Sequence, residues 1–171
     1  MPNRNEALRG AESSSVGLID AERRRVIVGM LALPAVVSAC TEASAAPVIR
    51  VHLGPSCGCC REWVRHLEAN GFTVETFEGG NNEARARLGM PVQYGSCHTG
   101  EIEGYAIEGH VPASEILRLI DERPQAVGIA VPGMPIGSPG MDGPAYGGRV
   151  DPYDVLLVRH DGSAEVYRAY R

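Results

Sequence analysis

The chain has 171 residues, of which 44% are apolar, so it is long enough for one ordinary hydrophobic core, and we expect only one. Its formal net charge is −5, and all 16 of its basic side chains are arginines. No run of basic residues interleaves with aromatic residues, as a nucleic-acid-binding surface would require, and we therefore exclude that class of protein.

The first part of the chain has the features of an export signal. A long polar lead ends in Arg23-Arg24-Arg25, and an apolar run follows from Val26 to Ala39. Fourteen helical residues reach about 21 Å, against about 30 Å of hydrocarbon in a membrane, so this run predicts a signal peptide rather than a membrane span. The arginine pair before the apolar run is typical of a twin-arginine signal, and a Sec signal is the alternative.

Two cleavage sites are compatible with this signal. Val37-Ser38-Ala39-Cys40 resembles a lipobox, which would make Cys40 a lipid-modified N-terminus and the protein a membrane-anchored lipoprotein. Ala43-Ser44-Ala45 has the small-x-small pattern of ordinary cleavage, which would release a soluble protein. Either site exports the protein to the periplasm. We expect residues 1–46 to be signal peptide and linker, and residues 47–171 to form one thioredoxin-like metal-binding domain.

The rest of the chain predicts strands that alternate with helices, which indicates an α/β protein. In chain order we expect a strand at 48–53, a thiol-bearing loop, a helix ending near 70, a strand at 72–77 and a short helix at 83–88. Two short strands near 97–99 and 105–107, a helix at 112–123 and a strand at 126–131 follow. Residues 132–149 are too rich in Gly and Pro for a regular element, and an Asp-Gly turn then joins the strands of a C-terminal β-hairpin.

Three thiols stand at the start of the first predicted helix, in Gly54-Pro55-Ser56-Cys57-Gly58-Cys59-Cys60. Cys57 and Cys60 form the C-x-x-C pair that thioredoxin-like redox sites place between a strand and a helix, where the helix N-terminus favours the thiolate. Cys59 is one thiol more than a disulfide needs, whereas a soft metal such as Cu(I) accepts three or more thiolates. Because unprotected thiols oxidise outside the cell membrane, the cluster needs a metal or a disulfide. We favour a metal site; a dithiol redox site, or a structural disulfide beside a spare thiol, are the alternatives.

Further soft ligands follow the thiol cluster along the chain. Cys97 precedes the third predicted strand, a segment that packs against the C-x-x-C loop in thioredoxin-like folds, so Cys97 would supply a fourth sulfur; otherwise it is a small buried apolar residue. His98 and His110 would add imidazole ligands, unless they are hydrogen-bonded structural residues. Met134 and Met141 offer thioethers, which suit Cu(I) and form no disulfides, unless they only cover a groove. We expect structural roles for the remaining histidines, His52, His66 and His160.

Taken together, four motifs resemble those of the CopG-type family of periplasmic copper-resistance proteins, long described as a domain of unknown function. They are C-x-C-C at 57–60, Cys-His at 97–98, Gly-His-Val-Pro at 109–112 and Val-Pro-Gly-Met-Pro-x-Gly-Ser-Pro-Gly-Met at 131–141. The resemblance covers about residues 48–170. It implies a thioredoxin-like fold that binds a small cluster of copper ions, and a role in copper tolerance through interconversion of Cu(I) and Cu(II). It also implies cluster thiolates at Cys57, Cys59, Cys60 and Cys97, with His98, His110 and Met134 as neighbours or ligands.

We therefore expect an α/β, thioredoxin-like protein with a C-terminal β-hairpin and a Pro/Gly/Met-rich loop. Its expected function is to bind copper in the periplasm, in copper resistance and homeostasis, alongside other periplasmic copper-handling proteins. The alternative is a periplasmic thiol-disulfide oxidoreductase that uses Cys57 and Cys60. We favour a binding protein over a copper or thiol oxidoreductase.

Overall fold

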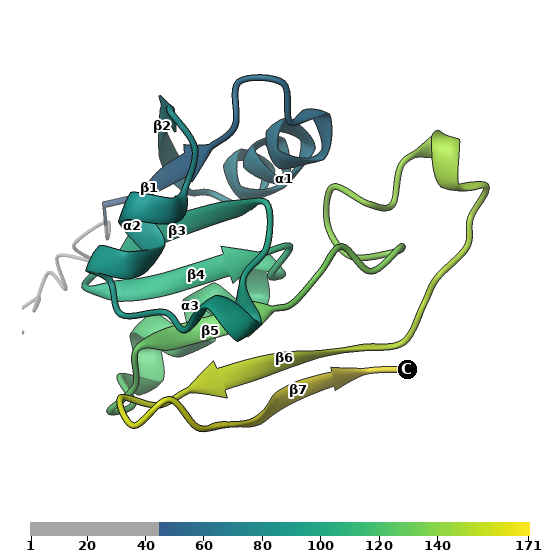
Figure 1. Cartoon of the computed structure of the whole chain (residues 1–171). Helices are drawn as coiled ribbons and strands as arrows, with labels where there is room; N and C mark the ends of the chain where they lie inside the picture. Colours follow the sequence, from purple (N-terminus) through teal and green to yellow (C-terminus); the bar gives the residue numbers. More distant parts are fainter. Residues whose placement is uncertain (1–44) are drawn as a thin grey trace, which may run out of the picture. The chain divides into compact units, whose positions relative to one another are not determined.

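The computed structural model describes residues 45–171 (Figure 1). The expected apolar signal segment, its arginines and Cys40 lie outside the described residues. Within residues 45–171 there is no helix of the length and apolar character that crossing a membrane demands.

Strands and helices alternate along the described part of the chain, as the sequence predicts. The first half contains β1 (Val48–Leu53), α1 (Gly58–Ala69), β2 (Thr73–Glu78), α2 (Asn82–Arg87) and a single 3₁₀ turn, η1 (Val92–Tyr94). The second half contains β3 (His98–Ile102), β4 (Tyr105–Gly109), α3 (Ala113–Glu122), β5 (Gly128–Val131), the 3₁₀ turn η2 (Pro144–Tyr146), β6 (Tyr153–Val158) and β7 (Ala164–Tyr170). Between β5 and β6 the Gly- and Pro-rich segment forms loops and turns, with η2 as its one helical turn, because its prolines lack N–H donors and its glycines favour turns.

Seven strands form one sheet in the order β2-β1-β3-β4-β5-β6-β7. β1 and β2 are parallel, whereas β3 is antiparallel to both β1 and β4. β4 and β5 are parallel and connected through α3, and β6 and β7 form the expected antiparallel hairpin. The predicted α/β class is confirmed. The thioredoxin-like character of the fold stays a prediction, and β5, β6 and β7 continue the sheet beyond β4.

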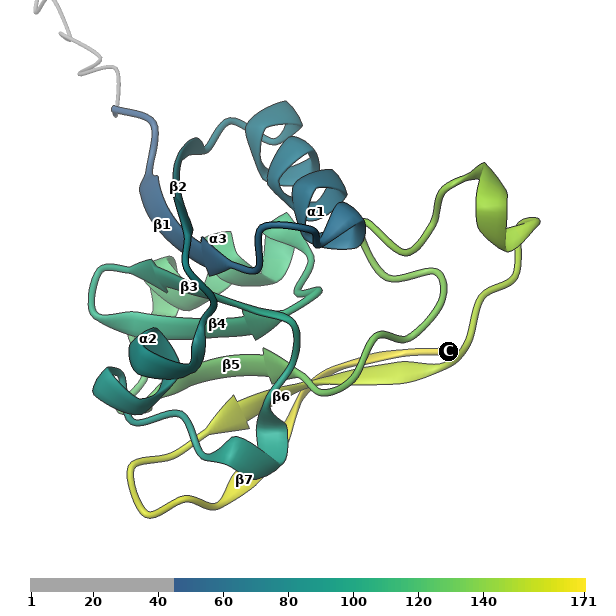
Figure 2. The ribbon, with the colours of Figure 1, turned by 45° about the horizontal axis from the view of Figure 1, so that its top comes forward.

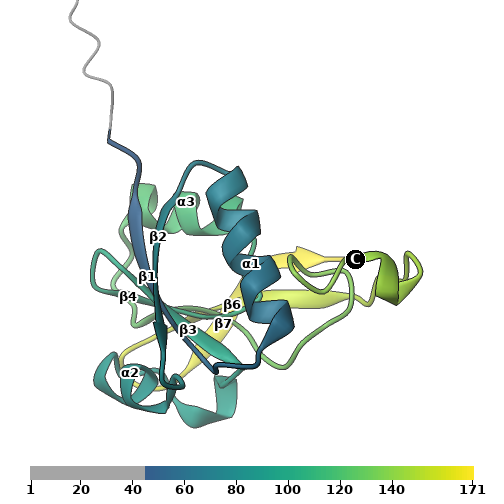
Figure 3. The same ribbon diagram turned by 90° about the horizontal axis from the view of Figure 1, so that it is seen from above.

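Helices cover both faces of the sheet, and the strand sequences explain which face each one covers. In β1 the buried residues alternate as Ile49, Val51 and Leu53, so they share one face of the sheet. These residues pack in one core with Trp63 of α1 and with residues of α3. A smaller cluster lies on the other face and includes Met90, just after α2. Figure 3 accordingly shows α1 and α2 on opposite sides of the sheet.

The segments that carry the predicted ligands meet at one end of the strands. The strand register pairs Leu53 at the end of β1 with His98 at the start of β3. At the same end of the strands, Gly109 at the end of β4 pairs with Val131 at the end of β5. Four parts of the chain therefore meet at this end of the strands: the thiol loop, the segment before β3, His110 and the loop after β5. Figure 2 shows the loop after β5 beside the start of α1.

Candidate metal centre

The first turn of α1 holds three of the four predicted cysteine ligands. Cys57 occupies the N-cap position without a side-chain capping bond, and Cys59 and Cys60 follow within the helix. No acidic residue stands in this turn. The three sulfurs stand at the end of α1 that carries the partial positive charge and free N–H groups of a helix.

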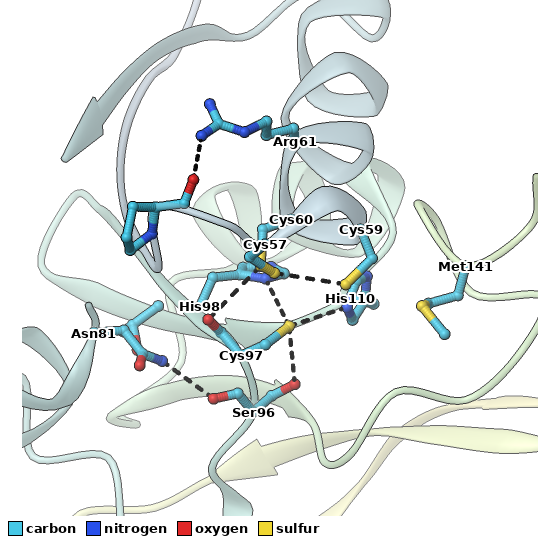
Figure 4. Close-up of a disulfide and its surroundings, with 12 residues drawn as sticks. Cys57, Cys59, Cys60, Arg61, Asn81, Ser96, Cys97, His98, His110 and Met141 are labelled. Atoms are coloured by element: carbon cyan, nitrogen blue, oxygen red, sulfur yellow. Dashed lines mark hydrogen bonds between the residues drawn. A yellow bond between two sulfur atoms is a disulfide. The ribbon is translucent and has the colours of Figure 1, made fainter. Parts of the chain in front are cut away.

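Four sulfur atoms come together at this point, from two separate segments of the chain. The Sγ atoms of Cys57, Cys59, Cys60 and Cys97 all lie within 4.8 Å of one another. Cys57 and Cys60 are joined as a disulfide, and the Cys59 sulfur lies 3.6 Å from that of Cys57. Cys59 and Cys97 are free, and both are partly exposed, whereas Cys60 is buried (Figure 4).

Two histidines lie against Cys97 on the side away from solvent. The Nδ1 of His110 donates to the carbonyl oxygen of Pro139 at 2.9 Å, because a carbonyl can only accept, and this fixes the proton on Nδ1. The other ring nitrogen, Nε2, then presents its lone pair to the Cys97 sulfur, 3.3 Å away. A histidine held in this way by a backbone carbonyl is oriented as metal-binding histidines usually are.

His98 is wholly buried beside the same sulfur. Its Nδ1 lies 3.4 Å from the Sγ of Cys97, and its ring packs on Trp63 with centroids 4.3 Å apart. Its Nε2 has no hydrogen-bond partner among the described residues. A buried polar atom without a partner is costly. The other ring nitrogen, Nδ1, faces the Cys97 sulfur and is the atom placed to meet a metal bound there.

Burial favours the uncharged forms of Cys97, His98 and His110. It lowers the pKa of His98 to about 3, with the nearby charge of His110 adding to the effect, although the Gly109 carbonyl close by acts in the opposite direction. Burial also lowers the pKa of His110. The pKa of the Cys97 thiol is raised to about 11, first by burial and then by the charge of Cys59. At neutral pH Cys97 is therefore a thiol and the two imidazoles beside it are neutral, so a metal ion would have to displace the Cys97 proton.

The loop after β5 closes over the start of α1. Gly140 has φ +83°, and a Cβ there would lie 2.7 Å from the carbonyl oxygen of Cys59, so only glycine fits this contact. The next residue, Met141, is nearly buried, and its sulfur accepts a hydrogen bond from the Tyr146 hydroxyl at 3.2 Å. Beside it a cleft of about 570 Å³, lined by Cys59 among others, opens to solvent.

Comparisons with known proteins identify the family. The chain is 49% identical to a solved structure called "Copper resistance protein copG- Form 2", with a TM-score of 0.67 over 73% of this chain and 98% of that one. The chain belongs to the CopG family. A second structure, "Copper resistance protein copG- Form 1", gives 50% identity, a TM-score of 0.66 and coverage of 72% and 98%. The family described as "Protein of unknown function, DUF411" matches residues 94–141, and no curated protein matches.

Most residues predicted as ligands for this CopG-family chain lie together. The four cysteines form one group, and Cys97 also forms a second group with His98 and His110. Met134 is 53% exposed. Its role as a ligand stays a prediction. Of the histidines expected to be structural, His66 accepts a hydrogen bond from the N–H of Ala113 at the start of α3.

The sequence analysis underestimates two residues near the metal centre. Met141, and not Met134, is the buried methionine on the Cys59 and His110 side of the group (Figure 4). Its signal is the Pro-Gly before it, which holds the loop close to α1. Ser96 is the second: its Oγ lies 3.9 Å from the Cys97 sulfur and donates to the carbonyl oxygen of Gly133 at 2.6 Å. It links the segment before β3 to the loop after β5.

Proposed function

We propose that this chain is a periplasmic copper-binding protein of copper resistance and homeostasis, which holds copper ions in a multinuclear thiolate cluster. The observation that carries the proposal is the group of four sulfurs within 4.8 Å of one another. A disulfide uses two of them and leaves two free thiols in contact with it, a poor arrangement for a compartment that oxidises thiols. Soft thiolates select Cu(I), and sulfurs this close can bridge neighbouring ions.

The residues that would hold the copper ions fall into two sets. Cys57, Cys59, Cys60 and Cys97 supply the thiolates, and the Nε2 of His110 and the Nδ1 of His98 supply imidazole nitrogen from the buried side. Met134 is the proposed thioether ligand, and the buried Met141 on the Cys59 and His110 side of the group is a second candidate. Bound copper would add one-electron chemistry, because a mixed sulfur and nitrogen set accommodates both Cu(I) and Cu(II).

Loading of all four sulfurs requires that the Cys57–Cys60 bond be reduced first. A dithiol reductant supplies the two electrons and two protons and is itself oxidised to a disulfide, and the two thiols formed lose their protons when they bind a metal. Cys97 must give up its proton against its raised pKa. Copper uptake should therefore weaken as the pH falls, since protons compete with copper for the sulfurs.

The proposal extends to where the protein works. Residues 1–46 would be a twin-arginine or Sec signal with its linker, and Cys40 would carry a lipid anchor if the lipobox is used. The names of the two similar structures support a role in copper resistance for this chain. Its partners would be copper ions and other periplasmic copper-handling proteins.

A second function is favoured by one specific observation, the disulfide between Cys57 and Cys60 at the start of α1. In a thioredoxin-like arrangement such a pair can exchange electrons with substrate dithiols, which would make the chain a thiol-disulfide oxidoreductase. This function gives no purpose to Cys59 or Cys97, which we regard as the argument against it.

One experiment separates the two functions. The exported protein is purified without oxygen, reduced and titrated with Cu(I), while insulin reduction is assayed in parallel. We expect uptake of several copper ions per chain, lost on alkylation of the thiols, and no insulin reduction. His160→Ala, in the turn between β6 and β7, serves as the control and should bind as the parent does. Insulin reduction without stable copper uptake would support the oxidoreductase instead.

A further inference from the structure

A buried ion pair lies beneath the segment that carries Cys97. Glu108 of β4 is fully buried, and Arg85 of α2 is 11% exposed. The Oε1 of Glu108 accepts from the Nε and Nη2 of Arg85 at 3.1 and 2.8 Å, and its Oε2 accepts from the Thr99 hydroxyl at 2.6 Å. A buried charge pair is weak evidence for stability, because desolvation offsets most of the attraction, so its presence calls for another reason.

The pair makes its remaining bonds to the backbone of Ser96. The N–H of Ser96 donates to the Oε1 of Glu108 at 2.6 Å. Its carbonyl oxygen accepts from the Nη2 of Arg85 at 2.6 Å. The same oxygen accepts from the Nδ2 of Asn81 at 3.2 Å, a bond that Figure 4 shows. Both polar groups of the residue before Cys97 are thus held by side chains from α2, from the N-cap of α2 and from β4. Bonds to charged groups are the stronger kind of hydrogen bond.

These bonds fix Cys97 from one side, and the sheet fixes it from the other. His98 is paired with Leu53, the last residue of β1 before the thiol loop. Between these two anchors Cys97 has little freedom, and the carbonyl oxygen of Cys97 lies 3.7 Å from the Cys60 sulfur.

We propose that the Arg85–Glu108 pair is a positioning device, which holds Ser96 so that the Cys97 sulfur stays beside the other three. Arg85 and Glu108 touch no ligand themselves; they act through Cys97. The consequence of this inference rests on the proposed copper function. The pair would determine whether four sulfurs or only three are in place to bind copper.

The test combines Glu108→Gln with Cys97→Ser in a double-mutant cycle. Cu(I) affinity is measured by competition with a chromogenic chelator, and folding is checked by circular dichroism. In the parent background, Glu108→Gln should weaken Cu(I) binding by roughly tenfold to a hundredfold, the range of one charged buried hydrogen bond. In the Cys97→Ser background it should weaken binding by less than about twofold, since the sulfur through which it acts is gone. Equal losses in both backgrounds would overturn the proposal, because they would show a general effect on the fold.

A second readout needs no copper. In the metal-free protein, the rate of iodoacetamide labelling is measured separately for the peptides of Cys97 and Cys59. Glu108→Gln should speed labelling of Cys97 by roughly tenfold and leave Cys59 unchanged, because release of Ser96 exposes the sulfur. An unchanged Cys97 rate would overturn the positioning role. If the parent binds no copper but Cys97 is released by the substitution, the proposed function fails and the positioning role stands.

Two further variants complete the design. Glu101→Gln breaks the exposed Arg87–Glu101 pair on the neighbouring strand, joined at 2.8 Å, and should change neither readout. Should Glu108→Gln fail to fold, Arg85→Lys takes its place in the same cycle. Lysine keeps the positive charge opposite Glu108 but lacks the planar fork that also reaches Ser96, so it should produce the same pattern of losses.

Discussion

Gly140→Ala is the substitution whose effect the structure specifies most fully. Gly140 has φ +83°, and a Cβ there would lie 2.7 Å from the Cys59 carbonyl oxygen and 2.8 Å from the backbone nitrogen of Trp63. The left-handed conformation costs an alanine ~1–2 kcal/mol. The overlap adds ~1–3 kcal/mol, since backbone atoms of a helix cannot rotate away as a flexible side chain would. We expect a total loss of about 2–5 kcal/mol in the free energy of unfolding.

Gly133→Ala is the matched control for this prediction. Gly133 lies in the same loop with φ +73°, but a Cβ there would meet nothing within 4 Å. It should therefore lose only the conformational ~1–2 kcal/mol. Urea unfolding of the reduced, metal-free proteins measures both losses, with unchanged m-values as the check on two-state behaviour. Equal losses for the two variants would refute the reasoning that this loop is pressed against the start of α1.

Other predictions follow from the thiols and the buried imidazole. Cys59→Ser should lower the number of Cu(I) ions bound per chain, measured by anaerobic titration, yet leave exchange of the Cys57–Cys60 pair with a dithiol reductant largely intact; full copper capacity would argue against a site of more than two thiolates. His98 should make the metal-free protein less stable in acid. Its pKa falls from 6.5 when unfolded to about 3 when folded. Its contribution to the free energy of unfolding is therefore complete above pH 6.5 and is lost as the pH falls from 6.5 to about 3. The loss should reach about 3 kcal/mol near pH 4 by urea unfolding, and His98→Leu should flatten the profile; the same slope in that variant would exclude His98 as its cause.

Local sequence signals predict much of this fold and the position of its thiols. The apolar run at 48–53, the thiols after it and the stop at Asn70-Gly71 specify a strand, a loop and a helix in that order, with Cys57 at the helix start. Pairing of β1 with β3 then brings the segment before β3 to the thiol loop. The proximity of Cys97 to the triplet therefore follows from topology, which the element order indicates.

Contacts that depend on distant side chains are harder to predict. Glu108 stands in a strand pattern like many exposed glutamates, and nothing near it in sequence marks Arg85, 23 residues earlier, as its buried partner. Likewise Met134 and Met141 occupy similar Pro/Gly surroundings, and only the approach of Gly140 to α1 decides which is buried. Whether Cys57 and Cys60 form a disulfide or bind a metal depends on the redox potential and the metal around the protein, which no sequence encodes.

X-ray absorption at the copper edge of the Cu(I)-loaded, reduced protein tests the central claim most directly. The account predicts a first shell dominated by sulfur with copper–copper scattering beyond it, and fewer copper neighbours in Cys97→Ser. A first shell of nitrogen and oxygen, with Cys57 and Cys60 still joined in the loaded protein, would contradict it.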